Sequence, residues 1–248
     1  DCLLSRGLGD VYKRQLMQFL KPALQPSAFD EIKNTSLGKL VRDQLLGQIM
    51  SGALEPGQAL REPELVEQMK VSRVPVREAL RELESMGLVV SRKHSGVYIR
   101  ELSQQEVADL YAFRSVLDRH AGQMAERLPQ PQRDELVAKL QACVQQMDEG
   151  LTQGHGQTYY QANLQFHWLF IESTGNREIA NSYRDIIQKL HLARLKNLSS
   201  QDHRRASNEE HKRIVRALEQ SASELAPQAC AGLLADHVLN AYRRLAEN

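Results

Sequence analysis

The stretch from Val71 to Leu83 constrains the fold of this chain more than any other segment. Apolar residues recur in it at helical spacing, and arginines occupy every fourth position on a second face, namely Arg73, Arg77 and Arg81. Pro75 fits only the first turn of a helix, so Ser72 is the predicted N-cap, with its hydroxyl accepting the Val74 amide. A basic stripe of this kind is typical of a DNA-binding helix, and also of an ordinary surface helix with solvated arginines.

The surrounding segments favour DNA binding. One predicted helix covers residues 36–50, a second is opened by Pro63, and the Val71–Leu83 segment opens the third. Two β-branched runs then flank a loop, residues 93–96, that contains a lysine, a histidine and a glycine. Three helices followed by a basic-tipped hairpin predict a winged helix-turn-helix domain over residues 36–102.

Composition sets limits on the remaining functions. The 248 residues are 42% hydrophobic and 25% charged, as in a globular protein, and the formal net charge is only +1. Contacts with nucleic acid must therefore come from local clusters of basic residues. No membrane span or secretory signal is found, and three cysteines without metal-like or paired spacing fit a reducing compartment, so we expect a cytoplasmic protein. Residues 1–35 are expected to be a disordered tail and arm, and residues 1–15 resemble translated adapter sequence.

The first domain resembles the GntR family of bacterial transcription regulators. The matching residues are Gly52-x-Leu54-x-Pro56-Gly57, Leu60-x-Glu62, Val71-Ser72-Arg73-x-Pro75-Val76-Arg77-Glu78-Ala79-Leu80, Leu83, Gly87-Leu88-Val89 and Gly96. Val74 departs from the family, in which many members have a small polar residue at this position.

This resemblance implies how the domain contacts DNA. Arg73 and Arg77 would enter the major groove, where arginine bonds guanine O6 and N7 in bidentate fashion. Ser72, at the helix N-terminus, would meet a phosphate. Gly96 would let the wing approach the minor groove, with Lys93 and His94 near the phosphates. We expect Arg81 to pair internally with Glu78 or Glu84 rather than contact a base.

Residues 103–248 predict an all-helical bundle. Ser103 and Glu106 have the spacing of a capping box, and the long helix that they begin ends before Pro129. Further helices are expected near 132–148, 157–173, 176–197, 207–220 and 223–246, which makes about six, with no strand among them. The predicted fold class is therefore mainly α, with an N-terminal winged helix-turn-helix and a C-terminal helical bundle.

Three histidines of the second domain, His167, His211 and His237, lie on three different predicted helices. If these helices pack together, the three neutral imidazoles could converge as ligands for Zn²⁺, Ni²⁺ or a similar divalent ion. Spacing alone leaves open the ordinary alternative of surface histidines or core histidines with hydrogen-bond partners.

The second domain resembles the FCD domain, the effector-binding partner of the winged helix in FadR-type GntR regulators. The matching motifs are Leu110-Tyr111-Ala112-Phe113-Arg114, Asn163-x-x-Phe166-His167, Gly175-Asn176, Glu210-His211-x-x-Ile214 and Asp236-His237. In metal-binding members an Asp and three His hold the ion, which here implies Asn163, His167, His211 and His237, with Asn163 replacing the Asp. Arg114 is the implied partner of an effector carboxylate. Its alternative role is a structural pair with Asp118, one turn further along.

The predicted function is that of a ligand-responsive transcription regulator and not an enzyme. As a homodimer it would read a palindromic operator in double-stranded DNA, and it would sense a small organic or sugar acid in the helical domain. One alternative is an acyl-CoA-responsive regulator without a metal, which the histidine set argues against. The other is a metal-dependent enzyme with Glu210 as the general base, which leaves the winged helix unexplained. No membrane partner is expected.

Overall fold

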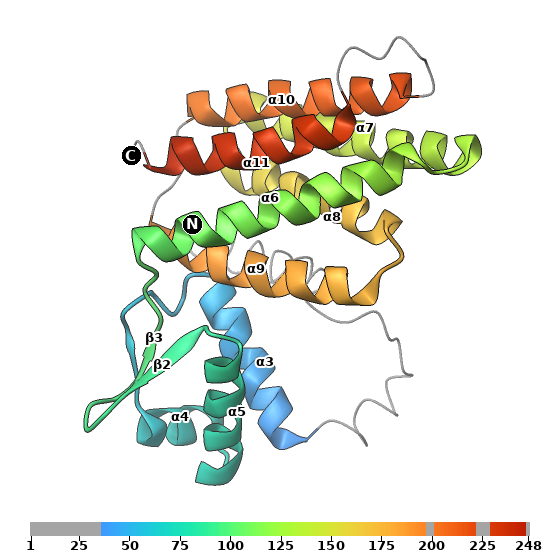
Figure 1. The fold of residues 1–248 in the computed structure, drawn as a ribbon. Helices are drawn as coiled ribbons and strands as arrows, with labels where there is room; N and C mark the ends of the chain where they lie inside the picture. Colours follow the sequence, from blue (N-terminus) through green and yellow to red (C-terminus); the bar gives the residue numbers. More distant parts are fainter. Residues whose placement is uncertain (1–35, 197–200, 222–228, 247–248) are drawn as a thin grey trace. The chain divides into compact units, whose positions relative to one another are not determined.

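The computed structural model describes residues 36–196, 201–221 and 229–246. Within these ranges the chain forms nine helices and one three-stranded sheet (Figure 1), which confirms the predicted mainly α fold class. The chain divides into two compact units, and the second begins at Ser103. Residues 187–196, the last part of α9 (Arg177–Lys196), group with the first unit. The predicted tail and arm, residues 1–35, lie outside the described residues.

Three helices make up most of the first unit: α3 (Leu37–Met50), α4 (Glu62–Met69) and α5 (Arg73–Ser85). The α3 helix begins where the Ser36 side chain accepts the Lys39 amide at 3.2 Å. The α4 helix is followed by Lys70, whose φ of 53° turns the chain into the short connection before α5. This helix–turn–helix order is the one expected from the positions of the proline residues and the turns.

The apolar stripe of α5 forms the core of the first unit. Val76, Ala79, Leu80 and Leu83 are all buried. The α3 helix packs against α5 and contributes Leu45 and Ile49, neither of which is exposed. Burying an aliphatic side chain stabilises a fold by roughly 1.5–3 kcal/mol, so this stripe holds α5 in place while its other face stays in solvent.

The wing is a small antiparallel sheet. Its strands are β1 (Ala59–Leu60), β2 (Val89–Arg92) and β3 (Gly96–Ile99), in the order β1-β3-β2. Val89 pairs with Ile99 and Arg92 with Gly96, which leaves residues 93–95 as the tip of the hairpin. The short β1 strand, between α3 and α4, therefore ties the wing to the helices.

The second unit is a helical bundle. It contains α6 (Gln104–Glu126), α7 (Gln130–Thr152), α8 (Gly156–Ser173), the first part of α9, α10 (Gln201–Gln220) and α11 (Cys230–Ala246). The α7 helix is longer than predicted and α10 begins earlier, while part of the predicted 223–246 helix lies outside the described residues. The capping box is present: the Ser103 hydroxyl accepts the Glu106 amide, and the Glu106 carboxylate accepts the Ser103 amide.

The bundle has a simple pattern of neighbours. Figure 1 shows α6 beside α11, and α6 also packs against α8, while α10 packs against both α7 and α11. None of the described helices is both long and apolar enough to cross a membrane.

Gly122 sets the closest approach between α6 and α11. A Cβ atom at this position would lie only 2.7 Å from the Cα of Ala231 and 3.0 Å from its backbone nitrogen. Backbone atoms cannot swing aside as a flexible side chain can. The two helices therefore pack at a distance that only glycine permits.

We predict that Gly122→Ala lowers the free energy of unfolding, by up to about 2 kcal/mol. The extra methyl overpacks the contact, and this cost outweighs the gain of about 1 kcal/mol that alanine brings to a helix interior. Urea unfolding followed by circular dichroism measures the change. Gly232→Ala is the matched control, because Gly232 lies in α11 with nothing within 4 Å of its added Cβ. It should be neutral or stabilising, and equal effects of the two changes would contradict the prediction.

Candidate functional site

The N-terminus of α5 presents polar side chains to solvent. Ser72, Arg73 and Arg77 are all exposed. Ser72 is the N-cap residue, as predicted, with extended backbone angles of −72° and 169°. Its hydroxyl makes no capping hydrogen bond, so the predicted bond to the Val74 amide is wrong. The helix therefore begins with an uncapped N-terminus, a favourable position for an anion because its amides point outward.

Arg77 is oriented by an acidic residue of α4. Its Nε lies 2.9 Å from the Glu62 carboxylate, while its two terminal nitrogens bond to no residue that the structure describes. The expected pairing of Arg81 with Glu78 or Glu84 is wrong: Arg81 makes no ion pair within the described ranges, and Glu84 instead accepts the Ser91 amide at 2.8 Å. An arginine held through Nε keeps its outer edge available for a bidentate contact.

The wing tip carries the other predicted DNA contacts. Lys93, His94 and Gly96 are all exposed there. His94 has a φ of 61° and Gly96 a φ of 106°, and a Cβ added to Gly96 would meet nothing within 4 Å. Glycine is thus required at this position for its backbone conformation and not for internal packing.

Three helices of the second unit bring together three histidines. His167 comes from α8, His211 from α10 and His237 from α11, and each offers a ring nitrogen within 4.8 Å of the others. The ring centroids of His211 and His237 are 4.2 Å apart, and that of His167 lies 5.2 Å from His237. All three side chains are buried, and the ring of Phe166 packs against His211. The three imidazoles lie tens of residues apart in the sequence and form one cluster in the structure, which we call the histidine cluster.

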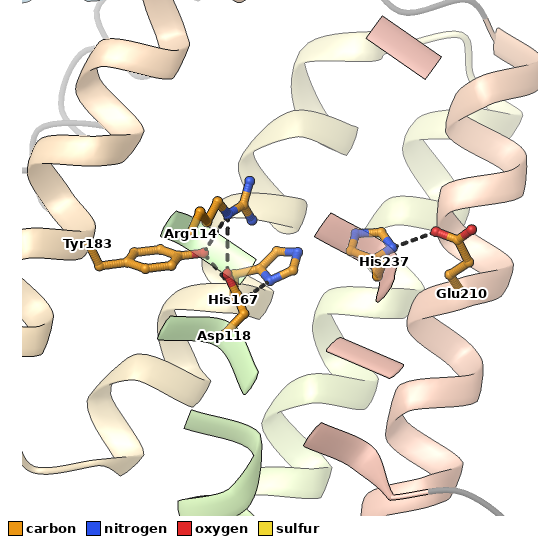
Figure 2. A network of polar contacts seen from close by, with 6 residues as sticks. All are labelled: Arg114, Asp118, His167, Tyr183, Glu210 and His237. Carbon is orange, nitrogen blue, oxygen red and sulfur yellow. Dashed lines mark hydrogen bonds and ion pairs between the residues drawn. The ribbon is translucent and has the colours of Figure 1, made fainter. Parts of the chain in front are cut away.

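Two carboxylates orient two of the three histidines of this cluster. Figure 2 shows Asp118 beside His167 and Glu210 beside His237; both oxygen–Nδ1 distances are 2.7 Å. Glu210 is held in turn by the amide of Asn240 and by Arg244. A histidine that donates Nδ1–H to a carboxylate keeps a lone pair on Nε2, the arrangement found behind histidine metal ligands.

The remaining ring nitrogens are left without partners. Nε2 of His167 and both ring nitrogens of His211 are buried and form no hydrogen bond with any described residue. Burial lowers the pKa of His167 to about 4, although the Asp118 carboxylate opposes this, and it lowers the pKa of His211 well below its usual value. The pKa of His237 is also lowered by burial. The cluster therefore holds neutral imidazoles at neutral pH, the form that can donate to a cation.

Arg114 lies next to this cluster, on α6. Its Nε donates to the Tyr183 hydroxyl at 3.0 Å and lies 3.3 Å from an Asp118 oxygen (Figure 2). Burial alone would raise the pKa of Asp118, but the contacts with His167 and with the Arg114 guanidinium lower it. The structural pair with Asp118 is thus present. It occupies only one edge of the guanidinium, since the terminal nitrogens bond to nothing among the described residues.

Asn163 lies one turn before His167 on α8 and is half-buried. It makes no hydrogen bond with the described part of the chain, so its amide is not committed to a structural role. Its assignment as a metal ligand, which came from the family resemblance, stays a prediction.

Sequence reasoning missed three groups that support these side chains. Tyr183 carried no signal at all, because it approaches Arg114 from a helix far along the chain. Glu210 was considered as part of a family motif and as a catalytic base, but not as the carboxylate that orients His237. Glu62 was noted only as part of a family motif, and its pairing with Arg77 depends on how α4 packs beside α5.

Two family models match the chain. The model described as "Bacterial regulatory proteins, gntR family" matches residues 37–99, and the FCD domain model matches residues 109–236. The first match covers the winged helix, and the second contains Arg114 and most of the histidine cluster; His237 lies one residue beyond its end.

Known regulators are similar to this chain over most of its length. The Nta operon transcriptional regulator of Aminobacter aminovorans is 28% identical, over 77% of this chain and 86% of the relative. The gluconate operon transcriptional repressor of Bacillus subtilis (strain 168) is 28% identical, over 67% of this chain and 64% of the relative. Among solved structures, McbR/YncC of E. coli superposes with a TM-score of 0.69 at 21% identity, over 86% of this chain and 98% of that one. This last likeness shows the shared fold.

The histidine cluster makes a prediction for metal-free protein. Unfolded histidine has a pKa of about 6.5, and the folded values are lower, so below this pH the unfolded chain binds more protons. The free energy of unfolding, measured with urea in the presence of a chelator, should therefore fall as pH decreases from 7 to 5. Each buried histidine contributes up to about 1.4 kcal/mol per pH unit in this window.

His211→Gln should reduce this slope, because one depressed pKa is lost. His155→Gln, which changes an exposed histidine at the start of α8, is the control and should leave the slope unchanged. A slope that is the same in all three proteins would contradict the prediction.

Proposed function

This chain belongs to the gntR family of bacterial regulatory proteins and carries an FCD domain, and we propose that it senses a small carboxylic or sugar acid beside a divalent metal ion and changes its operator binding in response. The relatives found are transcription regulators and not enzymes. The observation that carries the proposal is the histidine cluster, with buried ring nitrogens that lack any partner among the described residues.

The donor set fits a divalent ion. His167, His211 and His237 would hold it, since three neutral imidazoles suit Zn²⁺ or Ni²⁺. Asp118 and Glu210 fix the orientation of two of these rings. A buried imidazole nitrogen without a partner costs stability, so a bound cation would satisfy an interaction that the protein itself leaves open. Such an ion supplies positive charge and coordination positions for acid oxygens.

Asn163 is the proposed fourth donor. It shares a helix face with His167 and would offer its amide oxygen. Because this oxygen carries no formal charge, the protein ligands would leave the full charge of a divalent ion uncompensated. An anionic effector then gains more from binding beside the metal than it would in a site that includes an aspartate.

Arg114 is the proposed partner of the effector carboxylate. Its Nε is engaged with Tyr183 and Asp118, which leaves the two terminal nitrogens as a fork that matches a carboxylate. The Asp118 side chain contacts both Arg114 and His167. Binding of an acid at Arg114 and of a metal at His167 would therefore be linked through one shared carboxylate.

A relative suggests the class of acid. The name of the Bacillus subtilis protein identifies it as a repressor of a gluconate operon, and gluconate is a sugar acid. We therefore propose a hydroxylated acid of this class as the effector and use gluconate as the first probe. The histidine cluster argues against an acyl-CoA effector, whose recognition needs no imidazole ligands.

The winged helix is the proposed reader of DNA. Arg73 and Arg77 would contact guanines in the major groove, Ser72 a phosphate, and the Lys93–Gly96 tip the neighbouring backbone and minor groove. A homodimer would present two such helices to a palindromic operator, in the cytoplasm. Acid and operator would affect each other's affinity by the same factor, as linkage requires.

We predict that Arg73→Ala and Arg77→Ala each weaken operator binding by about 10–100-fold, because each removes a bidentate contact worth roughly 1–3 kcal/mol. The probe is a palindromic duplex enriched by the wild-type protein from a random-sequence library, and binding is measured by fluorescence anisotropy at fixed salt. Lys139→Ala removes one exposed positive charge from α7 and is the control. If both arginine variants bind the enriched duplex as tightly as the wild type does, the DNA assignment fails.

We further predict that metal and acid binding can be separated by substitution. Wild-type protein incubated with zinc should retain on the order of one ion per chain by elemental analysis, and His211→Ala should retain none. Glu210→Gln should weaken zinc binding by about 10–100-fold, since it replaces the carboxylate that orients His237 with a neutral amide. Arg114→Lys should keep its zinc yet bind gluconate at least about tenfold more weakly in calorimetry, because lysine cannot present a fork.

His155→Ala controls for the general loss of a histidine and should not change zinc content. Wild-type protein that takes up no zinc or nickel would refute the metal part of the proposal. An Arg114→Lys variant that binds gluconate normally would refute the arginine part alone.

A further inference from the structure

The α5 helix exposes one apolar side chain among its arginines. Val74 is 64% exposed, the largest value for any large hydrophobic side chain in the described ranges. It is the second residue of α5, and the two residues that follow it, Pro75 and Val76, are buried. Exposed Arg73 precedes it, and exposed Arg77 lies one turn further along. Single exposed apolar residues are common on proteins, so the position of this one, and not its exposure alone, is informative.

The surroundings of Val74 leave it open on the side of the arginines. The first turn of α5 contains no acidic residue. Glu78, four residues after Val74, extends over α3, since a Cβ added to Gly38 would meet a Glu78 carboxylate oxygen at 2.6 Å. Arg77 is held through Nε by Glu62, at 2.9 Å. The start of α5 therefore presents an apolar side chain beside an arginine whose position is fixed.

We propose that Val74 reads the C5-methyl group of a thymine in the major groove, close to the guanine that Arg77 contacts. The inference rests on the proposed function, in which α5 is the reading helix, and it names a base that this helix selects. The residues at the N-terminus of such a helix are the ones that face base edges.

The chemistry of valine accounts for this selectivity. Its side chain has no hydrogen-bond donor or acceptor, and DNA covers it once the arginines on either side reach base edges. In the major groove guanine, adenine and cytosine present polar atoms, whereas thymine also presents a methyl group. A polar base edge that loses its water against a valine gains no partner in exchange, which costs binding free energy. A thymine methyl in the same place buries apolar surface, which favours binding.

The helix geometry predicts where the thymine lies. A β-branched side chain in a helix keeps one strongly preferred rotamer, so Val74 presents its two methyl groups in a fixed direction at little cost in entropy. Residues three apart on a helix have Cβ atoms about 5–6 Å apart, and stacked base pairs are about 3.4 Å apart. The thymine read by Val74 is therefore within about two base pairs of the guanine read by Arg77.

Replacement of thymine by deoxyuridine tests the proposal, because deoxyuridine lacks only the C5-methyl group. The probe is the palindromic duplex enriched by the wild-type protein, with each thymine replaced in turn at equivalent positions of both half-sites. Fluorescence anisotropy at fixed salt gives the dissociation constant. One thymine near the guanine should be sensitive, and its loss should weaken binding by about fourfold in each half-site, as expected for one buried methyl group.

The Val74→Ala variant assigns this sensitivity to the side chain. It should bind the unmodified duplex about fourfold to tenfold more weakly than the wild type does, and it should lose most of the deoxyuridine effect. The fold should be unaffected, because Val74 is exposed and alanine favours a helix, and circular dichroism checks this. Val116→Ala is the matched control: it truncates a valine of α6 that is 61% exposed, and it should keep the full deoxyuridine effect.

The outcomes separate this inference from the proposed function. A deoxyuridine effect that is present in the wild type and in Val116→Ala, and largely lost in Val74→Ala, supports the thymine contact. A wild type that tolerates deoxyuridine at every position, or a Val74→Ala variant that keeps the full effect, overturns the thymine contact while the arginine contacts stand. If Arg73→Ala and Arg77→Ala both bind the duplex normally, the reading helix itself fails, and the role of Val74 fails with it.

Discussion

The burial of the Asp118 carboxylate is the constraint on which the sensor unit depends. This side chain has no exposed surface, and transferring a carboxylate out of water costs several kcal/mol unless donors replace the solvent. Here the donors are Arg114 on its own helix, His167 on α8 and Tyr183 on α9. One buried charge therefore fixes the mutual placement of three helices, and it also orients the arginine and one imidazole of the proposed site.

The same principle applies to His237 in the histidine cluster, but not to His211. Glu210 is held by Asn240 and Arg244 and orients His237, whereas His211 has no partner for either ring nitrogen among the described residues. A core selected for stability alone would place an apolar ring at this position. Buried polar groups without partners are expected where function requires them, and here they surround the one point on which three imidazoles converge.

Much of the architecture follows from local sequence signals. The stripe Val76, Ala79, Leu80, Leu83 predicts both the α5 helix and its buried face, because helical spacing places apolar residues on one side whatever the tertiary context. The capping box at Ser103 and the glycine of the wing are equally local, since caps and turns depend on residues within a few positions. Helix ends were less accurate at α7 and α10, because α7 continues through Gly150 to Thr152 and α10 begins before Ser207. Gly150 is a site of close packing against the Tyr159 backbone rather than a helix stop.

The sequence alone determined the order of the helices, the basic face of α5 and the types of ligand available to the second unit. Only the tertiary structure decided that His167, His211 and His237 meet, that Tyr183 joins Arg114 and Asp118, and that Arg77 pairs with Glu62 while Arg81 pairs with neither of its predicted partners. Most of these contacts join helices that lie far apart in the chain, and the Arg77–Glu62 pair joins two consecutive helices. Their geometry depends on how the buried faces pack against one another, and on where glycines such as Gly122 allow close approach. Periodicity can place a residue on a helix face, but the packing of the whole bundle decides which residue it meets.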